Sequence, residues 1–251
     1  MTTTEVESVN RRGHCPRRFS FRNKPVKIKA LLAVLVYVFC GQASARTLEE
    51  NAPVARDVNA VFESKIMVAG RPQVTEWTLR RTAHRVEMQE GRNGTGEIWS
   101  RDEKGNISFE RVFHKQRRVL DYSAADLRSL GSYPEWDKIA DVIDPQLLGG
   151  ALKHVGTTRV MGKTAERYRG RLGSTSMEVT WLPQDRLPYQ VKQSGPNQRT
   201  ELKLKQLSAV TPTSSDQDST ASYTRLDYAD LGDDPSDPFF KRLFETAEHQ
   251  H

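Results

Sequence analysis

Apolar and polar residues alternate with a period of two along much of the chain between residues 57 and 210. In such a segment every second side chain is large and apolar, which is the pattern of a β-strand with one buried face. The clearest examples are 73–81, 84–89, 106–113 and 176–182. Their alternation predicts a sheet with one dry face and one wet face.

Turn signals separate these segments at hairpin spacing. Glycine, Asn and Asp accept tight-turn geometry at little cost, and they cluster at 91–96, 102–106, 162–163, 173–174 and 184–185. We therefore expect eight to ten short strands in an antiparallel meander.

Helical patterns interrupt the strands in the middle of the chain. Residues 123–130 begin with a Ser cap and continue with good helix formers. Residues 134–143 start with a proline and then show helical apolar spacing, until Asp144-Pro145 ends the pattern. Gly149-Gly150 allow a hinge, and strands resume at about residue 157. Two short helices are thus predicted between two blocks of strands.

The positive charge of the chain lies in its first 45 residues. The sequence has 38 Lys and Arg against 32 Asp and Glu, but residues 1–45 contain eight of the basic and two of the acidic residues. Residues 46–251 are therefore balanced, with 30 of each sign. This balance argues against nucleic acid as a partner.

The same 45 residues resemble a secretory signal peptide. Residues 30–40 are apolar without a break, Lys27 and Lys29 precede them, and Ala43 and Ala45 frame a cleavage site. Eleven apolar residues are too few to cross a hydrocarbon layer of ~30 Å. We expect cleavage after Ala45, export to a bacterial periplasm, and no transmembrane span in the mature chain. The alternative for residues 30–40 is an uncleaved membrane anchor. A second hypothesis is that translation starts at Val26, in which case residues 1–25 are an artefact of the assigned start.

Candidate chemistry is sparse. Both cysteines, Cys15 and Cys40, lie in the leader, so the mature chain has no thiol for a disulfide, a metal site or catalysis. Attachment of a lipid at Cys40 is disfavoured because bulky residues precede it. No zinc-binding, nucleophile-elbow, phosphate-loop or dinucleotide motif appears. We therefore expect no enzyme activity, no cofactor and no metal.

A polar, low-complexity linker at 211–222 precedes a distinct C-terminal extension at 223–251. The extension begins with an alternating, edge-strand-like segment and continues with a helical pattern whose apolar stripe could dock onto the parent domain or onto a partner protein. The candidate docking residues are Phe239, Phe240, Leu243 and Phe244.

One strand places three arginines on a single face. In residues 165–172, Arg167, Arg169 and Arg171 alternate with Glu166, Tyr168 and Gly170. A solvated outer surface is the simpler interpretation, and a stripe that binds an anionic ligand is the alternative.

The segment 156–194 (GTTRVMGKTAERYRGRL…MEVTWLPQDRLPYQVKQS), together with the order of leader, meander, two short helices and second meander, resembles the periplasmic lipoprotein-carrier superfamily (LolA/LolB-like). The resemblance covers about residues 57–210 within a domain expected at 46–210. It implies a mainly β fold: a curved antiparallel sheet, or incomplete β-barrel, with the two mid-chain helices as a lid over an apolar cavity.

We accordingly expect an exported, non-catalytic binding protein that holds acyl chains or a lipidated partner. The alternative is an envelope scaffold that has the same fold with a filled core and docks an envelope protein through its C-terminal helix. The candidate cavity residues are Trp77, Leu79, Val86, Met88, Trp99, Phe109, Phe113, Met177, Val179 and Trp181. The candidate lid residues are Leu127, Leu130, Trp136, Ile139 and Ile143.

Overall fold

A computed structural model describes residues 56–68, 70–91, 94–196, 198–210, 220–232 and 239. The predicted signal peptide and its cleavage site lie outside these residues. Within them, no helix has the length and apolar character needed to cross a membrane.

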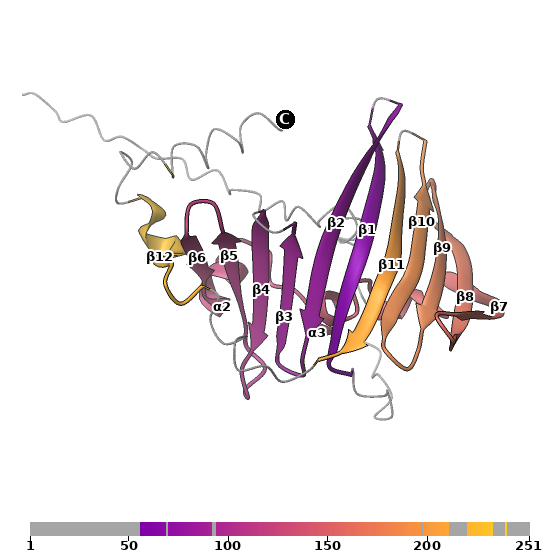
Figure 1. The fold of residues 1–251 in the computed structure, drawn as a ribbon, viewed down its shortest axis with the longest axis horizontal. Helices are drawn as coiled ribbons and strands as arrows, with labels where there is room; N and C mark the ends of the chain where they lie inside the picture. Colours follow the sequence, from indigo (N-terminus) through magenta and orange to yellow (C-terminus); the bar gives the residue numbers. More distant parts are fainter. Residues whose placement is uncertain are drawn as a thin grey trace, which may run out of the picture.

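Twelve strands form one curved, unclosed sheet, confirming the predicted mainly β fold (Figure 1). Their order across the sheet is β12-β6-β5-β4-β3-β2-β1-β11-β10-β9-β8-β7. The first six strands are β1 (Val58–Val68), β2 (Arg71–Arg81), β3 (Arg85–Glu90), β4 (Thr95–Arg101), β5 (Ile107–Phe113) and β6 (Arg118–Tyr122). The others are β7 (Leu152–Val160), β8 (Lys163–Leu172), β9 (Thr175–Leu182), β10 (Leu187–Ser194), β11 (Arg199–Ala209) and β12 (Thr224–Asp227).

The sheet consists of two antiparallel meanders, β1–β6 and β7–β11, joined where β1 pairs with β11. The expected eight to ten strands were too few. Residues 118–122 and 152–156 lack a clear alternation, yet they form β6 and the first half of β7 because their neighbours in the sheet supply backbone partners.

The two predicted helices are present and short. α2 (Ala124–Ser129) begins at Ser123, whose side chain forms a capping box with Asp126. α3 (Trp136–Ala140) ends sooner than the sequence suggested, since Val142 adopts a left-handed backbone conformation with φ 68°. Ile143 therefore follows the helix rather than lying on it, and the 3-10 turn η1 (Pro145–Leu147) comes next.

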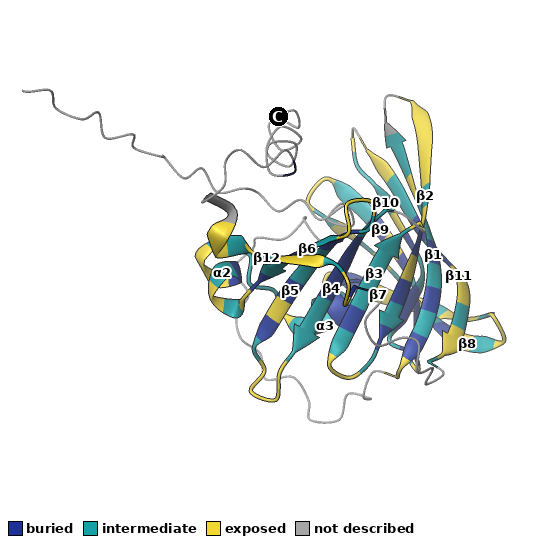
Figure 2. Ribbon diagram, turned by 60° about the vertical axis from the view of Figure 1, so that its left-hand side comes forward, coloured by how far each residue is buried: buried dark blue, intermediate teal, exposed yellow. Residues whose placement is uncertain are grey.

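Buried residues concentrate on the inner face of the curve, where α2 and α3 lie (Figure 2). The helices contribute Leu127, Ile139 and Ala140 to clusters whose other members come mostly from the strands. The sheet thus buries one face against the mid-chain insert, as the alternating sequence requires.

The C-terminal extension continues the same sheet. β12 pairs in parallel with β6, and Arg225 binds Asp121 with two hydrogen bonds and also contacts Glu110. The 3-10 turn η2 (Tyr228–Gly232) follows β12. Of the predicted helix, only Phe239 lies among the described residues.

Candidate functional site

The inner face of the sheet carries two apolar clusters, one beneath each helix. The larger cluster lies under α3. Six of the predicted cavity residues and two of the predicted lid residues are buried in it, and Trp136 packs against it. These eight are Trp77, Leu79, Val86, Met177, Val179, Trp181, Ile139 and Ile143.

The smaller cluster lies under α2, where Leu127 packs with Phe109, Phe113 and residues of β6. Leu130 packs against its margin. The ring of Phe239 also belongs to this cluster: it meets Phe113 edge-on at a centroid distance of 4.9 Å. Phe239 therefore docks on its own chain. The other three candidate docking residues, Phe240, Leu243 and Phe244, lie outside the described residues.

Three half-buried side chains lie between the two clusters: Met88 on β3, Trp99 on β4 and Tyr133 in the connection from α2 to α3. We call these three residues the seam. Trp99 and Tyr133 contact both clusters, while Met88 packs against the larger one. Trp99 stacks on Phe109 at 4.2 Å. All three side chains of the seam are thus partly exposed where the two clusters approach each other.

The end of α3 is fastened to the sheet by a buried arginine. Arg81, at the last position of β2, has no exposed surface. Its guanidinium donates hydrogen bonds to the carbonyl oxygens of Ala140 at 2.7 Å, Arg186 at 2.9 Å, Arg56 at 3.0 Å and Asp185. One side chain thereby joins β2, the end of α3, the turn between β9 and β10 and the residues before β1.

Asp141 completes this fastening. Its carboxylate accepts hydrogen bonds from Arg186 Nε at 3.1 Å and Nη2 at 2.5 Å, and Arg81 Nη1 lies 3.9 Å from Oδ1. Burial raises the pKa of Asp141, whereas its hydrogen bonds from Arg186 act in the opposite direction. We call Arg81, Asp141 and Arg186 the clamp.

The polar clamp could not be located by motif, because its members are far apart in the sequence and depend on tertiary pairing. One signal was available. Arg81 falls on the same alternating face as Trp77 and Leu79, so the apolar pattern itself placed an arginine in the core. A buried arginine needs several acceptors, and here backbone carbonyls supply most of them.

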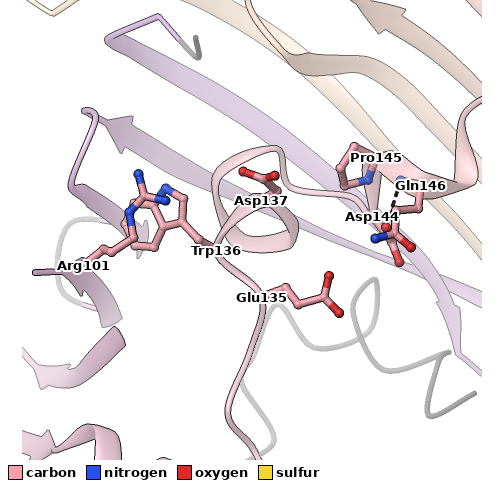
Figure 3. Close-up of a pocket in the computed structure, with 7 residues that line it drawn as sticks. All are labelled: Arg101, Glu135, Trp136, Asp137, Asp144, Pro145 and Gln146. Carbon is pink, nitrogen blue, oxygen red and sulfur yellow. Dashed lines mark hydrogen bonds between the residues drawn. The ribbon is translucent and has the colours of Figure 1, made fainter. Parts of the chain in front are cut away.

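A small polar pocket opens beside α3 (Figure 3). Its volume is about 130 Å³, which is below the ~300–1,000 Å³ of usual ligand sites. Arg101 lies over the ring of Trp136, and Lys138 bridges Glu135 and Asp144 at 3.0 and 3.1 Å. Since cations already accompany these acidic groups, the pocket is better explained as a structural joint than as a binding site. Its lining residues are Arg101, Glu135, Trp136, Asp137, Asp144, Pro145 and Gln146.

One buried carboxyl group lies on the inner face near the seam. Glu97 of β4 pairs across the sheet with Met88 and Arg111, and its side chain is buried. Burial raises the pKa of Glu97, while Arg111 and Trp99 oppose the shift.

This shift predicts a pH dependence of stability. A carboxyl group with a raised pKa in the folded state stabilises the fold below its unfolded pKa, and that stability is lost as pH rises through the folded pKa. The pH range over which this stability is lost therefore begins near the ordinary glutamate pKa of 4.5 and extends upward. We expect Glu97→Gln to remove this component, so that the variant loses less stability than the native protein between about pH 4 and pH 8. Urea unfolding across this range checks the difference, and parallel curves for both proteins would contradict it.

Within the described part of the chain, no group of three or more His, Cys, Asp or Glu side chains is placed to hold a metal ion. The side chains of the inner face are mostly apolar.

No protein-family model matches this chain, and a search of curated proteins finds no match. The solved structures that follow are similar to this chain with TM-scores of 0.40 or less. PNGF-II aligns with 71% of this chain at 11% identity and a TM-score of 0.40. This chain spans only 33% of the length of PNGF-II.

Two shorter proteins match over most of their length. A DUF1329 family protein from Desulfovibrio piger aligns with 76% of this chain and 95% of its own, at 10% identity and a TM-score of 0.35. A LolA superfamily protein from Nitrosomonas europaea aligns with 63% of this chain and 88% of its own, at 6% identity and a TM-score of 0.30.

Proposed function

We propose that this protein is a non-catalytic carrier of the bacterial envelope that holds acyl chains, or a partner bearing them, against the inner face of its sheet. The seam supports this proposal most directly. Met88, Trp99 and Tyr133 keep part of their surface uncovered on the apolar inner face, and Tyr133 lies in the connection between two helices of only six and five residues.

An acyl chain would enter between α2 and α3 and lie along the seam. Each methylene group transferred from water to such a surface contributes ~0.8 kcal/mol, so a few buried methylenes give useful affinity without any specific polar contact. The helices would separate to widen the site, while the clamp keeps the end of α3 attached to the sheet. Export through the leader would place the carrier in the periplasm.

A scaffold with a filled core is the second candidate, and the burial of the cavity residues favours it. Trp77, Leu79 and Val86 are at most 2% exposed and pack against their neighbours. In that case the fold would present its outer surface or its C-terminal extension to an envelope protein.

Mass spectrometry of protein purified from its native host separates the two functions. Co-purified phospholipid or acylated peptide is the outcome expected of a carrier. Lipid-free protein that captures one envelope protein, and loses it when residues 223–251 are deleted, would contradict the carrier and support the scaffold.

A further inference from the structure

Positive charge is concentrated on the two strands at one edge of the sheet. Residues 152–172, which form β7, β8 and their turn, contain six Lys or Arg and a single Glu. Lys163 is paired with Asp185 at 2.8 Å. Lys153, Arg167 and Arg171 are exposed, as is Arg169, which binds Glu178 at 2.9 Å. This edge is therefore strongly basic although the chain after residue 45 is balanced.

Cross-strand register shows which of these cations, among the described residues, face no carboxylate on the neighbouring strand. Along one row of the outer face, charges alternate in sign from strand to strand. The row consists of Glu201 on β11, Lys192 on β10, Glu178 on β9 and Arg169 on β8. At the edge the alternation fails, because Lys153 of β7 stands directly opposite Arg169. Like charges in directly opposed positions are unfavourable. A carboxylate on one further strand, opposite Lys153, would continue the row.

The next row leaves room for a second carboxylate. Arg167 lies opposite Gly156 of β7, and the space beside the Gly156 Cα is open. Because Gly156 has no side chain, an acidic side chain on an added strand could reach past it to Arg167.

The backbone of this edge is available for pairing. Within the described residues β7 pairs with β8 along one side, and its other side makes only the isolated bridge between Leu148 and Leu152. Beyond that bridge, alternate N–H and C=O groups of β7 point away from the sheet. Val155 and Met161, two of the most exposed large apolar side chains in the described part of the chain, lie on β7 and the turn that follows it.

We infer that the β7 edge binds an extended acidic peptide, which adds as a further strand along residues 153–160 and places carboxylates against Lys153 and Arg167. Apolar side chains of the same peptide would contact Val155 or Met161. A second copy of this chain is a poor occupant, since its own β7 edge would bring the same cations together. The bulge at Val155 and the lysine also discourage unselective edge pairing, which leaves an acidic strand as the matching ligand.

The test uses a fluorescent peptide of about nine alternating Glu and Val residues, long enough to pair along residues 153–160 of β7. Fluorescence anisotropy should show saturable binding to the full chain that weakens as salt is added. We expect the double variant Lys153→Glu with Arg167→Glu to weaken binding at least about tenfold. The matched control, Lys65→Glu with Lys104→Glu, makes the same change in net charge at exposed sites away from this edge and should bind as the native protein does.

Two further measurements make the inference falsifiable. A peptide of the same sequence with N-methylated backbone amides cannot form the ladder and should lose binding, so equal binding of both peptides would overturn strand addition. Equal losses in both double variants would overturn the location. The choice of partner would be overturned if the peptide failed to bind and Lys153 and Arg167 were instead required for binding to phosphatidylglycerol vesicles or for dimerisation of the chain. None of these results depends on whether the inner face binds acyl chains.

Discussion

Replacing Arg81 by Met is expected to lower the free energy of unfolding by about 3–5 kcal/mol, the usual cost of removing one partner from a buried charged network. The substitution leaves Asp141 with less compensation and deprives four carbonyl groups, two of them in buried hydrogen bonds, of this donor. Met fills similar space, so the loss reports on the polar contacts rather than on a cavity. Urea unfolding monitored by circular dichroism measures it.

Arg85→Met is the matched control for this experiment. Arg85 lies on the neighbouring strand and pairs with Glu87, but both side chains are about one-third exposed or more. A solvent-exposed pair of this kind contributes at most about 1 kcal/mol. If Arg81→Met and Arg85→Met cost the same, the clamp does not hold α3 to the sheet.

Replacing Trp99 by Asp is expected to reduce the uptake of a fluorescent fatty acid at least about tenfold. A charged group in the seam would have to be desolvated beneath the acyl chain, and the stacking surface beside Phe109 would be lost. Titration of the protein with the fluorescent acid measures the change.

Trp99→Phe controls for the loss of the indole itself, because it keeps an aromatic ring at the same position and should retain most of the uptake. Circular dichroism verifies that both variants fold. Unchanged uptake in a folded Trp99→Asp protein would move the acyl site away from the seam.

The fold was predictable because its information is local. Alternating segments such as 107–113 reveal a strand and the face that it buries, and a Ser cap with Asp three residues later marks the start of α2. Turn residues then give the antiparallel order of neighbouring strands. Strand pairing between distant segments, as between β1 and β11 or β12 and β6, depends on the whole sheet and is not encoded in any one segment.

The candidate site was predictable only in part. Alternation identified the inner-face residues, but it could not show that Trp77 would be enclosed while Met88 and Trp99 stay half-buried between the helices. That difference depends on tertiary packing between distant segments of the chain. The clamp depends on contacts between residues separated by as many as 105 positions, as between Arg81 and Arg186, for which the sequence gives no spacing rule.

Quenching of tryptophan fluorescence by a fatty acid brominated along its chain tests the carrier most directly. Two variants are compared, one with Trp99 as its sole tryptophan and one with Trp77 as its sole tryptophan. The carrier hypothesis predicts strong, saturable quenching of Trp99 fluorescence at fatty-acid concentrations that leave Trp77 fluorescence unchanged, because Trp77 is enclosed against Phe62. Absence of quenching at Trp99, or equal quenching of both proteins, would contradict binding at the seam.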